Sequence, residues 1–302
     1  MSALPPALSL SQPADRTRPA QAAALGQTVI AAASYLVARR AMTEIPAVPL
    51  GWARIVGSGI LYAVLLAGLR LPILPPRGRR LAYLGAGLLG LPLNQGLFLT
   101  GLARTEVSHA ALLYTLTPAV LLVLARVFQG ERIAPARALG IGLAFLGACA
   151  VLSENGVAGG VRLGDVLIGT GMMSWSLYTL VIGRLARADG AVAATAWAFV
   201  AGSAATVFLY PLAVPYPGVF WVASPAALGG FVYLLVGSSF TAYLLWTYAL
   251  SHLSAARVVV FSNLQPVIAS ALAWGILGER LSINEAVGGV LVLAGVMVVQ
   301  RA

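Results

Sequence analysis

Long apolar stretches alternate with short polar connections along nearly the whole chain. Most stretches approach the ~20 residues that a helix needs to cross a bilayer core of ~30 Å. The connections, such as the one from Leu71 to Gly78, hold most of the charged and turn-forming residues. The pattern therefore predicts an all-α membrane protein with ten transmembrane helices. We expect these spans at residues 20–39, 49–69, 81–103, 107–127, 134–153, 163–183, 191–212, 225–250, 253–277 and 283–300.

The second half of this pattern repeats the first. A shift of 148 residues places Pro118 on Pro266, and it places the Gly-Glu-Arg turn at 130–132 on the one at 278–280. Because each half holds five spans, an odd number, the second half must enter the membrane from the opposite side. The sequence thus predicts two inverted five-helix repeats, an arrangement that transporters use. The expected units are a disordered cytoplasmic tail at 1–19 and repeats at 20–153 and 163–301.

The composition agrees with a membrane protein and argues against a soluble enzyme. Hydrophobic residues make up 60% of the 302 residues and charged residues only 9%, whereas a soluble domain carries about 25% charged residues. The formal net charge of +10 comes from 19 basic residues, all of them arginine. We attribute this charge to the arginines of the connecting loops and expect no nucleic-acid partner.

The distribution of the arginines predicts the orientation of the chain, because loops rich in arginine stay on the cytoplasmic side. With the N-terminus inside, thirteen arginines are cytoplasmic, five are outside and Arg54 lies within a span. We therefore expect a multi-pass protein of a bacterial-type inner (plasma) membrane with both termini in the cytoplasm. The cytoplasmic set is Arg16, Arg18, Arg70, Arg77, Arg79, Arg80, Arg126, Arg132, Arg137, Arg184, Arg187, Arg257 and Arg301.

The five-plus-five repeat, its paired Gly-Glu-Arg turns and two proline motifs resemble the drug/metabolite transporter superfamily. The motifs are Leu-Thr-Pro at 116–118 and Leu-Gln-Pro at 264–266. The chain is most similar to the ten-helix EamA-type carriers, and the resemblance covers residues 20–301. Since that branch includes exporters of amino acids and related metabolites, the resemblance implies a small-solute carrier.

Polar and aromatic residues recur in the middle of several spans, where an unpartnered polar group is costly. Pro118 and Pro266 should kink spans four and nine and act as hinges, since proline has no N–H to donate. The polar residues around them either line a central cavity or hydrogen-bond to neighbouring helices. The aromatic pairs of spans six and eight are spaced by three residues and share one helical face. The candidate substrate-binding residues are Arg54, Asn94, Gln95, Tyr114, Thr115, Thr117, Trp175, Tyr178, Tyr243, Trp246, Asn263 and Gln265.

Arg54 has two interpretations, because a charged residue within a span is costly and usually functional. In the functional interpretation, Arg54 binds a substrate carboxylate or holds a gate closed. In the other, its side chain extends to the nearby outer interface of the membrane. No Asp, Glu or His lies deep in a predicted span, and the single cysteine, Cys149, lies in an apolar run. We therefore expect no metal, no cofactor and no proton-coupling carboxylate. The glycines from Gly85 to Gly90 fit a dinucleotide-binding pattern, but without a strand before them they indicate close helix packing.

These features together predict a carrier that exports a small organic solute, an amino acid or related metabolite, by alternating access. The first alternative is a multidrug exporter of hydrophobic or cationic compounds, which aromatic walls would suit. A membrane-embedded enzyme is a remote alternative, since the spans show no carboxylate cluster and no nucleophile with a base. As partners we expect the small-molecule substrate and the lipid bilayer, and the protein is predicted to be a monomer or a homodimer.

Overall fold

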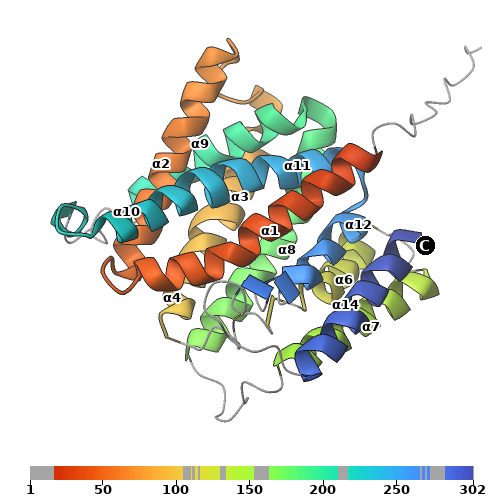
Figure 1. Cartoon of the computed structure of the whole chain (residues 1–302). Coiled ribbons are helices and arrows are strands. Elements are labelled where there is room, and N and C mark those ends of the chain that lie inside the picture. The colour runs from red at the N-terminus through yellow and green to blue at the C-terminus, as the bar shows by residue number, and fades with distance from the viewer. Residues whose placement is uncertain are drawn as a thin grey trace, which may run out of the picture.

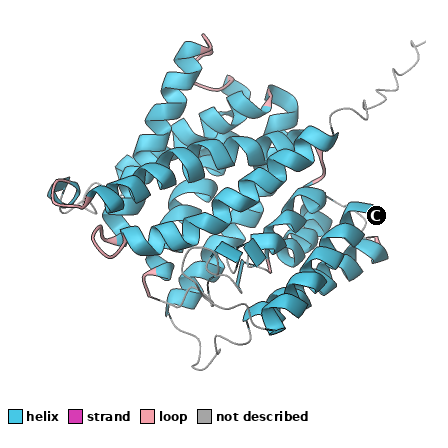
Figure 2. Cartoon of the chain, in the orientation of Figure 1, coloured by secondary structure: helices cyan, strands magenta, loops and turns pink. Residues whose placement is uncertain are grey.

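The computed structural model describes residues 17–104, 110, 113–114, 116–129, 134–152, 163–209, 217–265, 267–268, 271–272 and 283–301. Helices account for almost all of these residues, and the described part of the chain contains no β-strand (Figure 2). Five helical segments are long and apolar enough to cross a membrane: Thr17–Ala41, Ala47–Gly68, Leu163–Asp189, Ala191–Phe208 and Pro225–His252. The chain is therefore an all-helical, multi-pass membrane protein.

Where the structure describes the predicted spans, helices occupy them, and Figure 1 shows how these helices are arranged. Helix α8 continues past residue 183 to Asp189, and α1 begins at Thr17 instead of residue 20, with Pro19 tolerated in its first turn. The α-helices are α1 (Thr17–Ala41), α2 (Ala47–Gly68), α3 (Arg80–Leu88), α4 (Leu97–Leu102), α6 (Thr117–Gln129), α7 (Pro135–Leu152), α8 (Leu163–Asp189), α9 (Ala191–Leu209), α10 (Pro225–Val232), α11 (Ala242–His252), α12 (Ala255–Val259) and α14 (Ile283–Arg301). The remaining helical segments are η2 (Arg77–Arg79), η3 (Leu89–Gly96), η5 (Pro217–Phe220), η6 (Tyr233–Thr241) and η7 (Val260–Leu264).

Two of the predicted spans contain a π-helical segment in their middle. Segment η3 joins α3 to α4, and η6 joins α10 to α11. Pro92 accounts for the first, because its ring clashes with the preceding turn and it donates no N–H. In the second, the Thr241 hydroxyl donates to the Val236 carbonyl oxygen five residues earlier, at 2.9 Å. Such wide turns re-aim the side chains that they carry and are frequent at functional sites.

Close helix contacts are made through glycines. A Cβ atom on Gly147 of α7 would lie 2.6 Å from the Gly288 carbonyl oxygen of α14. Conversely, a Cβ on Gly295 of α14 would lie 2.5 Å from the Gly140 carbonyl oxygen of α7. The two helices lie side by side in Figure 1. Contacts this short require glycine, because any side chain would push the backbones apart.

The glycine run of span three also serves packing. A Cβ on Gly87 would meet the carbonyl oxygen of Ala198 on α9 at 2.4 Å, and one on Gly90 would meet the Tyr178 ring at 2.8 Å. A Cβ on Gly85, in contrast, would meet nothing within 4 Å. The packing interpretation of this run is confirmed for Gly87 and Gly90, and its resemblance to a dinucleotide-binding pattern has no functional meaning.

The packed interior is centred on α8, whose Trp175 and Tyr178 belong to the larger hydrophobic cluster together with Tyr243 and Trp246 of α11. Outward-facing positions of the helices are also apolar, for example Ile60 and Val64 on α2 and Phe208 on α9. A helix that is apolar on all sides is expected where one face meets neighbouring helices and the other meets lipid. The polar residues of the middle of the spans are therefore turned inwards, towards the site described next.

Candidate functional site

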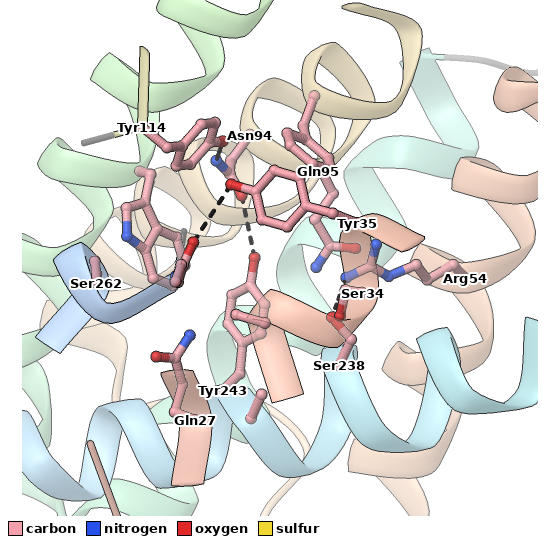
Figure 3. A pocket seen from close by; sticks show the side chains of 15 residues that line it. Gln27, Ser34, Tyr35, Arg54, Asn94, Gln95, Tyr114, Ser238, Tyr243 and Ser262 are labelled. Carbon is pink, nitrogen blue, oxygen red and sulfur yellow. Dashed lines mark hydrogen bonds between the residues drawn. The ribbon is translucent and has the colours of Figure 1, made fainter. Parts of the chain in front are cut away.

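A central cavity of about 90 Å³ lies between α1, α2, η3 and α8. Segments η6 and α11 of span eight and segment η7 of span nine complete its wall. Polar and aromatic side chains from these elements converge on it (Figure 3). The lining residues are Gln27, Ala31, Ser34, Tyr35, Arg54, Asn94, Gln95, Phe98, Tyr114, Trp175, Ser238, Ala242, Tyr243, Ser262 and Gln265.

Arg54 points into this cavity and not towards the outer interface. Its side chain is only 5% exposed, and its Nε and Nη2 atoms donate to the hydroxyls of Ser239 and Ser238 at 2.6 and 2.8 Å. Both serines lie on η6, so the π-helical segment turns two neighbouring hydroxyls towards one guanidinium. In the described part of the chain no carboxylate forms a salt bridge with Arg54. The cavity therefore holds a positive charge that hydroxyls orient but do not neutralise.

Asn94 and Gln95, neighbours on η3, have different surroundings. The Asn94 amide donates to the Tyr114 hydroxyl at 2.8 Å and to the Gly171 carbonyl oxygen at 3.0 Å, and its oxygen accepts from Tyr243 at 3.3 Å. Asn94 thus connects spans three, four, six and eight, as expected for helix cross-linking. The Gln95 oxygen accepts from Ser239 at 3.3 Å, which leaves its buried Nε2 without a partner in the described residues. Gln95 therefore offers an unused N–H close to the Arg54–serine group.

Neutral polar groups also gather where α1 faces span nine. The Tyr35 hydroxyl donates to the Gln265 Oε1 at 3.3 Å, and Gln27 and Ser262 are directed towards the same space (Figure 3). These side chains offer both donors and acceptors without a formal charge. The cavity is therefore charged near Arg54 and neutral near Gln265.

The remaining wall is aromatic. Trp175 lies with its ring centroid 5.3 Å from those of Tyr178, Tyr243 and Trp246. Phe98 makes edge contacts with Tyr35 at 5.3 Å and with Tyr114 at 5.5 Å. Such a wall accepts an apolar or aromatic part of a ligand at little cost in desolvation.

Seven of the residues predicted from the sequence line the cavity: Arg54, Asn94, Gln95, Tyr114, Trp175, Tyr243 and Gln265. Four others lie behind its wall. Tyr178 and Trp246 pack against Trp175, and Trp246 also donates its indole N–H to Thr179 at 3.3 Å. Asn263 is fully buried in η7, and neither its amide nitrogen nor its oxygen has a hydrogen-bond partner among the residues that the structure describes.

The fourth residue behind the wall, Thr117, explains the local structure at the first predicted hinge. Pro118 lies in the first turn of α6 and not in the middle of a continuous helix. The Thr117 hydroxyl donates to the Tyr114 carbonyl oxygen at 2.6 Å, so the group that the proline frees is satisfied locally. Thr115 and the second predicted hinge, Pro266, lie outside the described residues.

The polar lining from α1 and η6 was not among the residues predicted from the sequence. Gln27, Ser34 and Tyr35 recur at intervals that place them on one face of α1, and this spacing could have indicated them. Ser238 and Ser239 had no such signal, because a regular α-helix and a π-turn orient consecutive serines differently. Within the described residues no three His, Cys, Asp or Glu side chains cluster in a way that could hold a metal ion.

A multi-pass protein whose helices surround a small polar cavity with a buried arginine has the features of a solute transporter. The profile of the EamA-like transporter family matches residues 18–153 and 162–301, once in each half. The chain therefore belongs to the EamA-like transporter family, within the drug/metabolite transporter superfamily.

Individual relatives agree with this assignment. A probable terminal-alkyne amino-acid exporter of Streptantibioticus cattleyicolor is 31% identical over 240 residues, which cover 79% of this chain and 80% of the relative. The uncharacterized transporter YyaM of Bacillus subtilis is 26% identical over 226 residues, or 73% of each chain. The uncharacterized inner membrane transporter YedA of Escherichia coli K12 is 28% identical over 280 residues, which cover 89% of this chain and 87% of the relative.

The fold also has a counterpart among solved structures. One crystal structure superposes with a TM-score of 0.75 over 93% of this chain and 97% of the other, at 20% sequence identity. The family and the names of the relatives indicate a transporter and not an enzyme.

Proposed function

We propose that this protein exports a small metabolite that carries a carboxylate, an amino acid being the best candidate. The observation that carries the proposal is the buried Arg54 guanidinium in the cavity, without a carboxylate partner in the described residues. A charge at membrane depth is costly unless it is paired, so a negatively charged substrate group would supply the missing partner. The unused Gln95 N–H next to it adds a second donor for a carboxylate oxygen.

The rest of the cavity suits the remainder of an amino acid. The uncharged oxygens of Gln27, Ser262 and Gln265 can accept hydrogen bonds from an ammonium group, and Trp175 can cover an apolar side chain. The similarity to the Streptantibioticus relative, which is named an amino-acid exporter, supports the same class of substrate.

The multidrug alternative receives less support from this cavity. Its volume of about 90 Å³ is below the ~300 Å³ at which sites for drug-sized ligands begin. In addition, the charge of Arg54 would repel a cationic compound. An aromatic wall alone would be compatible with both alternatives, so the arginine discriminates between them.

We further propose alternating access by two inverted five-helix repeats, with ten spans in total and both termini in the cytoplasm. The reciprocal contact of α7 and α14 supports this proposal. Gly140 and Gly288 occupy equivalent positions of the two halves, and so do Gly147 and Gly295; each member of one pair approaches a member of the other. A two-fold relation between the halves produces such reciprocity. The proposed hinges remain Pro118, in the first turn of α6, and Pro266, which follows the lining residue Gln265 in the sequence.

The test is counterflow into liposomes that contain the purified protein and are preloaded with one amino acid. The external solutes are a panel of labelled amino acids, the decarboxylated amine of each, and a hydrophobic cation. We expect exchange of one or a few amino acids, no exchange of the matching amines, and similar rates with and without a pH gradient. Exchange of amines or of the cation in place of amino acids would contradict the proposal and support the multidrug alternative.

A further inference from the structure

A second pocket, separate from the central cavity, lies at one end of the helix bundle. It has a volume of about 350 Å³ and a mainly polar lining. The first residue of α1, the first turn of α7, the last turns of α8 and α11 and the start of α12 meet there. We call it the arginine pocket, and its principal residues are Thr17, Arg137, Arg187, His252, Ser254 and Arg257.

Three guanidinium groups from three different helices face this pocket, and none of the lining residues among those that the structure describes is acidic. Arg137 and Arg257 each also make an interaction within the protein. A guanidinium has five N–H donors, so one interaction leaves others for a ligand. An anion bound between these three positive groups would be attracted to each of them.

The pocket also supplies neutral donors. The buried Ser254 hydroxyl oxygen has no hydrogen-bond partner in the described part of the chain, although Ser254 stands at the start of α12, where a serine usually caps the helix. Thr17 adds a second hydroxyl. The His252 Nδ1 atom lies 2.8 Å from the Ser251 hydroxyl oxygen and 2.9 Å from the Tyr248 carbonyl oxygen, so this ring nitrogen faces partners of its own helix end. Guanidinium and hydroxyl donors around one space match the several acceptor oxygens of a phosphate group.

We propose that the arginine pocket binds a phosphate group. The phosphate belongs either to the headgroup of an anionic phospholipid or to a soluble phosphate compound, since both present the same charged oxygens. The helix ends that form the pocket are those at which a bilayer places its headgroups. They also belong to the side that the arginine count predicts to be cytoplasmic, where anionic lipids attract basic residues. The site is distinct from the central cavity, so it does not depend on which solute is transported.

The test uses the purified full-length protein in neutral detergent. Binding is measured by native mass spectrometry, with phosphatidylglycerol, phosphatidylcholine and inorganic phosphate as the three ligands. The variants are Arg187→Gln and Arg257→Gln, and the matched control is Arg184→Gln. Arg184 lies one turn before Arg187 on α8, outside the pocket lining, and donates to the Phe128 carbonyl oxygen at 3.3 Å. The melting temperature of each unliganded variant shows whether it is folded, and Arg187 is exposed, so its removal should not affect folding.

We expect phosphatidylglycerol to bind more tightly than phosphatidylcholine, and to bind about tenfold more weakly to Arg187→Gln, which is the usual effect of losing one charge-assisted hydrogen bond. Arg184→Gln should bind like the wild type. Binding of inorganic phosphate with the same variant pattern, without a preference for phosphatidylglycerol, would support the site with a soluble ligand. The proposal would be overturned if the two lipids bound equally and inorganic phosphate did not bind. It would also be overturned if Arg184→Gln and Arg187→Gln lost the same amount of binding affinity.

Discussion

At the scale of single residues, the cavity contains side chains that hold the protein together and side chains that have unused bonding capacity. The Asn94 amide bonds to three neighbours, whereas the Nε2 of Gln95 has no hydrogen-bond partner among the described residues. Arg54 is held in place by two serines, and no carboxylate of the described part of the chain neutralises it. These differences separate residues that are important for stability from those available to a substrate.

Replacing Arg54 with glutamine should weaken transport of a carboxylate substrate. We expect an increase in KM of about tenfold or more, because a hydrogen bond to a charged group contributes about 1.5–3 kcal/mol. The measurement is counterflow in liposomes over a range of substrate concentrations. Arg104→Gln is the control, since Arg104 is exposed in the turn after α4 and, among the described residues, its side chain donates to the Thr100 carbonyl oxygen. An unchanged KM in Arg54→Gln would exclude Arg54 as the carboxylate anchor.

The neighbouring amides should respond differently to alanine substitution. Asn94→Ala leaves the Tyr114 and Tyr243 hydroxyls and the Gly171 carbonyl with fewer partners, which should cost about 1–3 kcal/mol and lower the melting temperature. Gln95→Ala should leave the melting temperature nearly unchanged and reduce transport. Thermal unfolding and counterflow of the two variants, measured side by side, test this contrast. If Gln95→Ala lost more stability than Asn94→Ala, Gln95 and not Asn94 would be the residue that holds the helices together.

At the scale of helices, glycine contacts and irregular turns determine how close the elements come and which way their side chains face. The contact between α7 and α14 has no room for a Cβ at Gly147, whereas Gly142 of the same helix has nothing within 4 Å of that position. Segments η3 and η6 turn Gln95 and Ser239 towards one another across 144 residues of sequence.

Gly147→Leu should therefore prevent correct packing of α7 against α14, and Gly142→Leu should be tolerated. A Cβ at Gly147 would lie 2.6 Å from a backbone oxygen, so the helices must separate and lose their contact. We expect a strong decrease in folded protein after membrane extraction, measured by size-exclusion chromatography of a fluorescent fusion. If both variants elute like the wild type, the glycine contact is not needed for assembly.

The loop between α1 and α2 is joined to the start of α10 by Glu44. Its carboxylate accepts from the Ser224 backbone N–H at 2.7 Å and from the Ser224 hydroxyl at 2.8 Å, and these bonds hold the pKa of Glu44 below its ordinary value. A lowered pKa in the folded state means that the bonds stabilise the protein above the ordinary pKa of glutamate, about 4.3. This contribution disappears as the pH falls through the lower, folded-state pKa.

Glu44→Gln should accordingly melt at a slightly lower temperature than the wild type at pH 6, and the difference should shrink as the pH falls below the ordinary pKa of glutamate, about 4.3. The effect is small because Glu44 is exposed and water screens its charge. Thermal unfolding of both proteins from pH 7 to pH 3.5 measures it. A difference that grows towards low pH would contradict the assignment of the pKa shift.

At the scale of the whole molecule, both ends of the described chain lie towards the same end of the bundle. The start of α1 and the end of α14 are on the same side in Figure 1. An even number of spans would place them on one side of the membrane, and the arginine count predicts that this side is the cytoplasm. The arginine pocket lies at this end as well.

A green fluorescent protein fused after residue 302 should therefore be fluorescent, and an alkaline phosphatase fused there should be inactive, because the first requires a cytoplasmic and the second a periplasmic location. A phosphatase fused within the loop between α1 and α2 should be active. These activities, normalised to the amount of protein in the membrane, test the proposed topology. An active phosphatase at the C-terminus would show the opposite orientation or an odd number of spans.

Much of the fold and about half of the candidate site could be predicted from the sequence. The apolar stretches were recognisable because a bilayer requires a nearly constant length of apolar helix. Polar residues at mid-depth were recognisable because they are costly there, and Arg54, Gln95 and Gln265 do line the cavity. Trp246 and Asn263 satisfied the same criterion but lie behind the wall, because periodicity alone does not specify which neighbour a helix face meets.

The sequence by itself determined the class of protein, the positions of the helices and the predominance of lipid-facing surface, since these follow from local hydropathy. Only the tertiary structure decided which polar groups share one space. Arg54 meets Ser239 across 185 residues, and Tyr35 meets Gln265 across 230. Such contacts depend on how helices from distant parts of the sequence pack together, and the local pattern of a single span does not specify this packing. The unneutralised charge in the cavity, on which the proposed function rests, is a property of that three-dimensional arrangement.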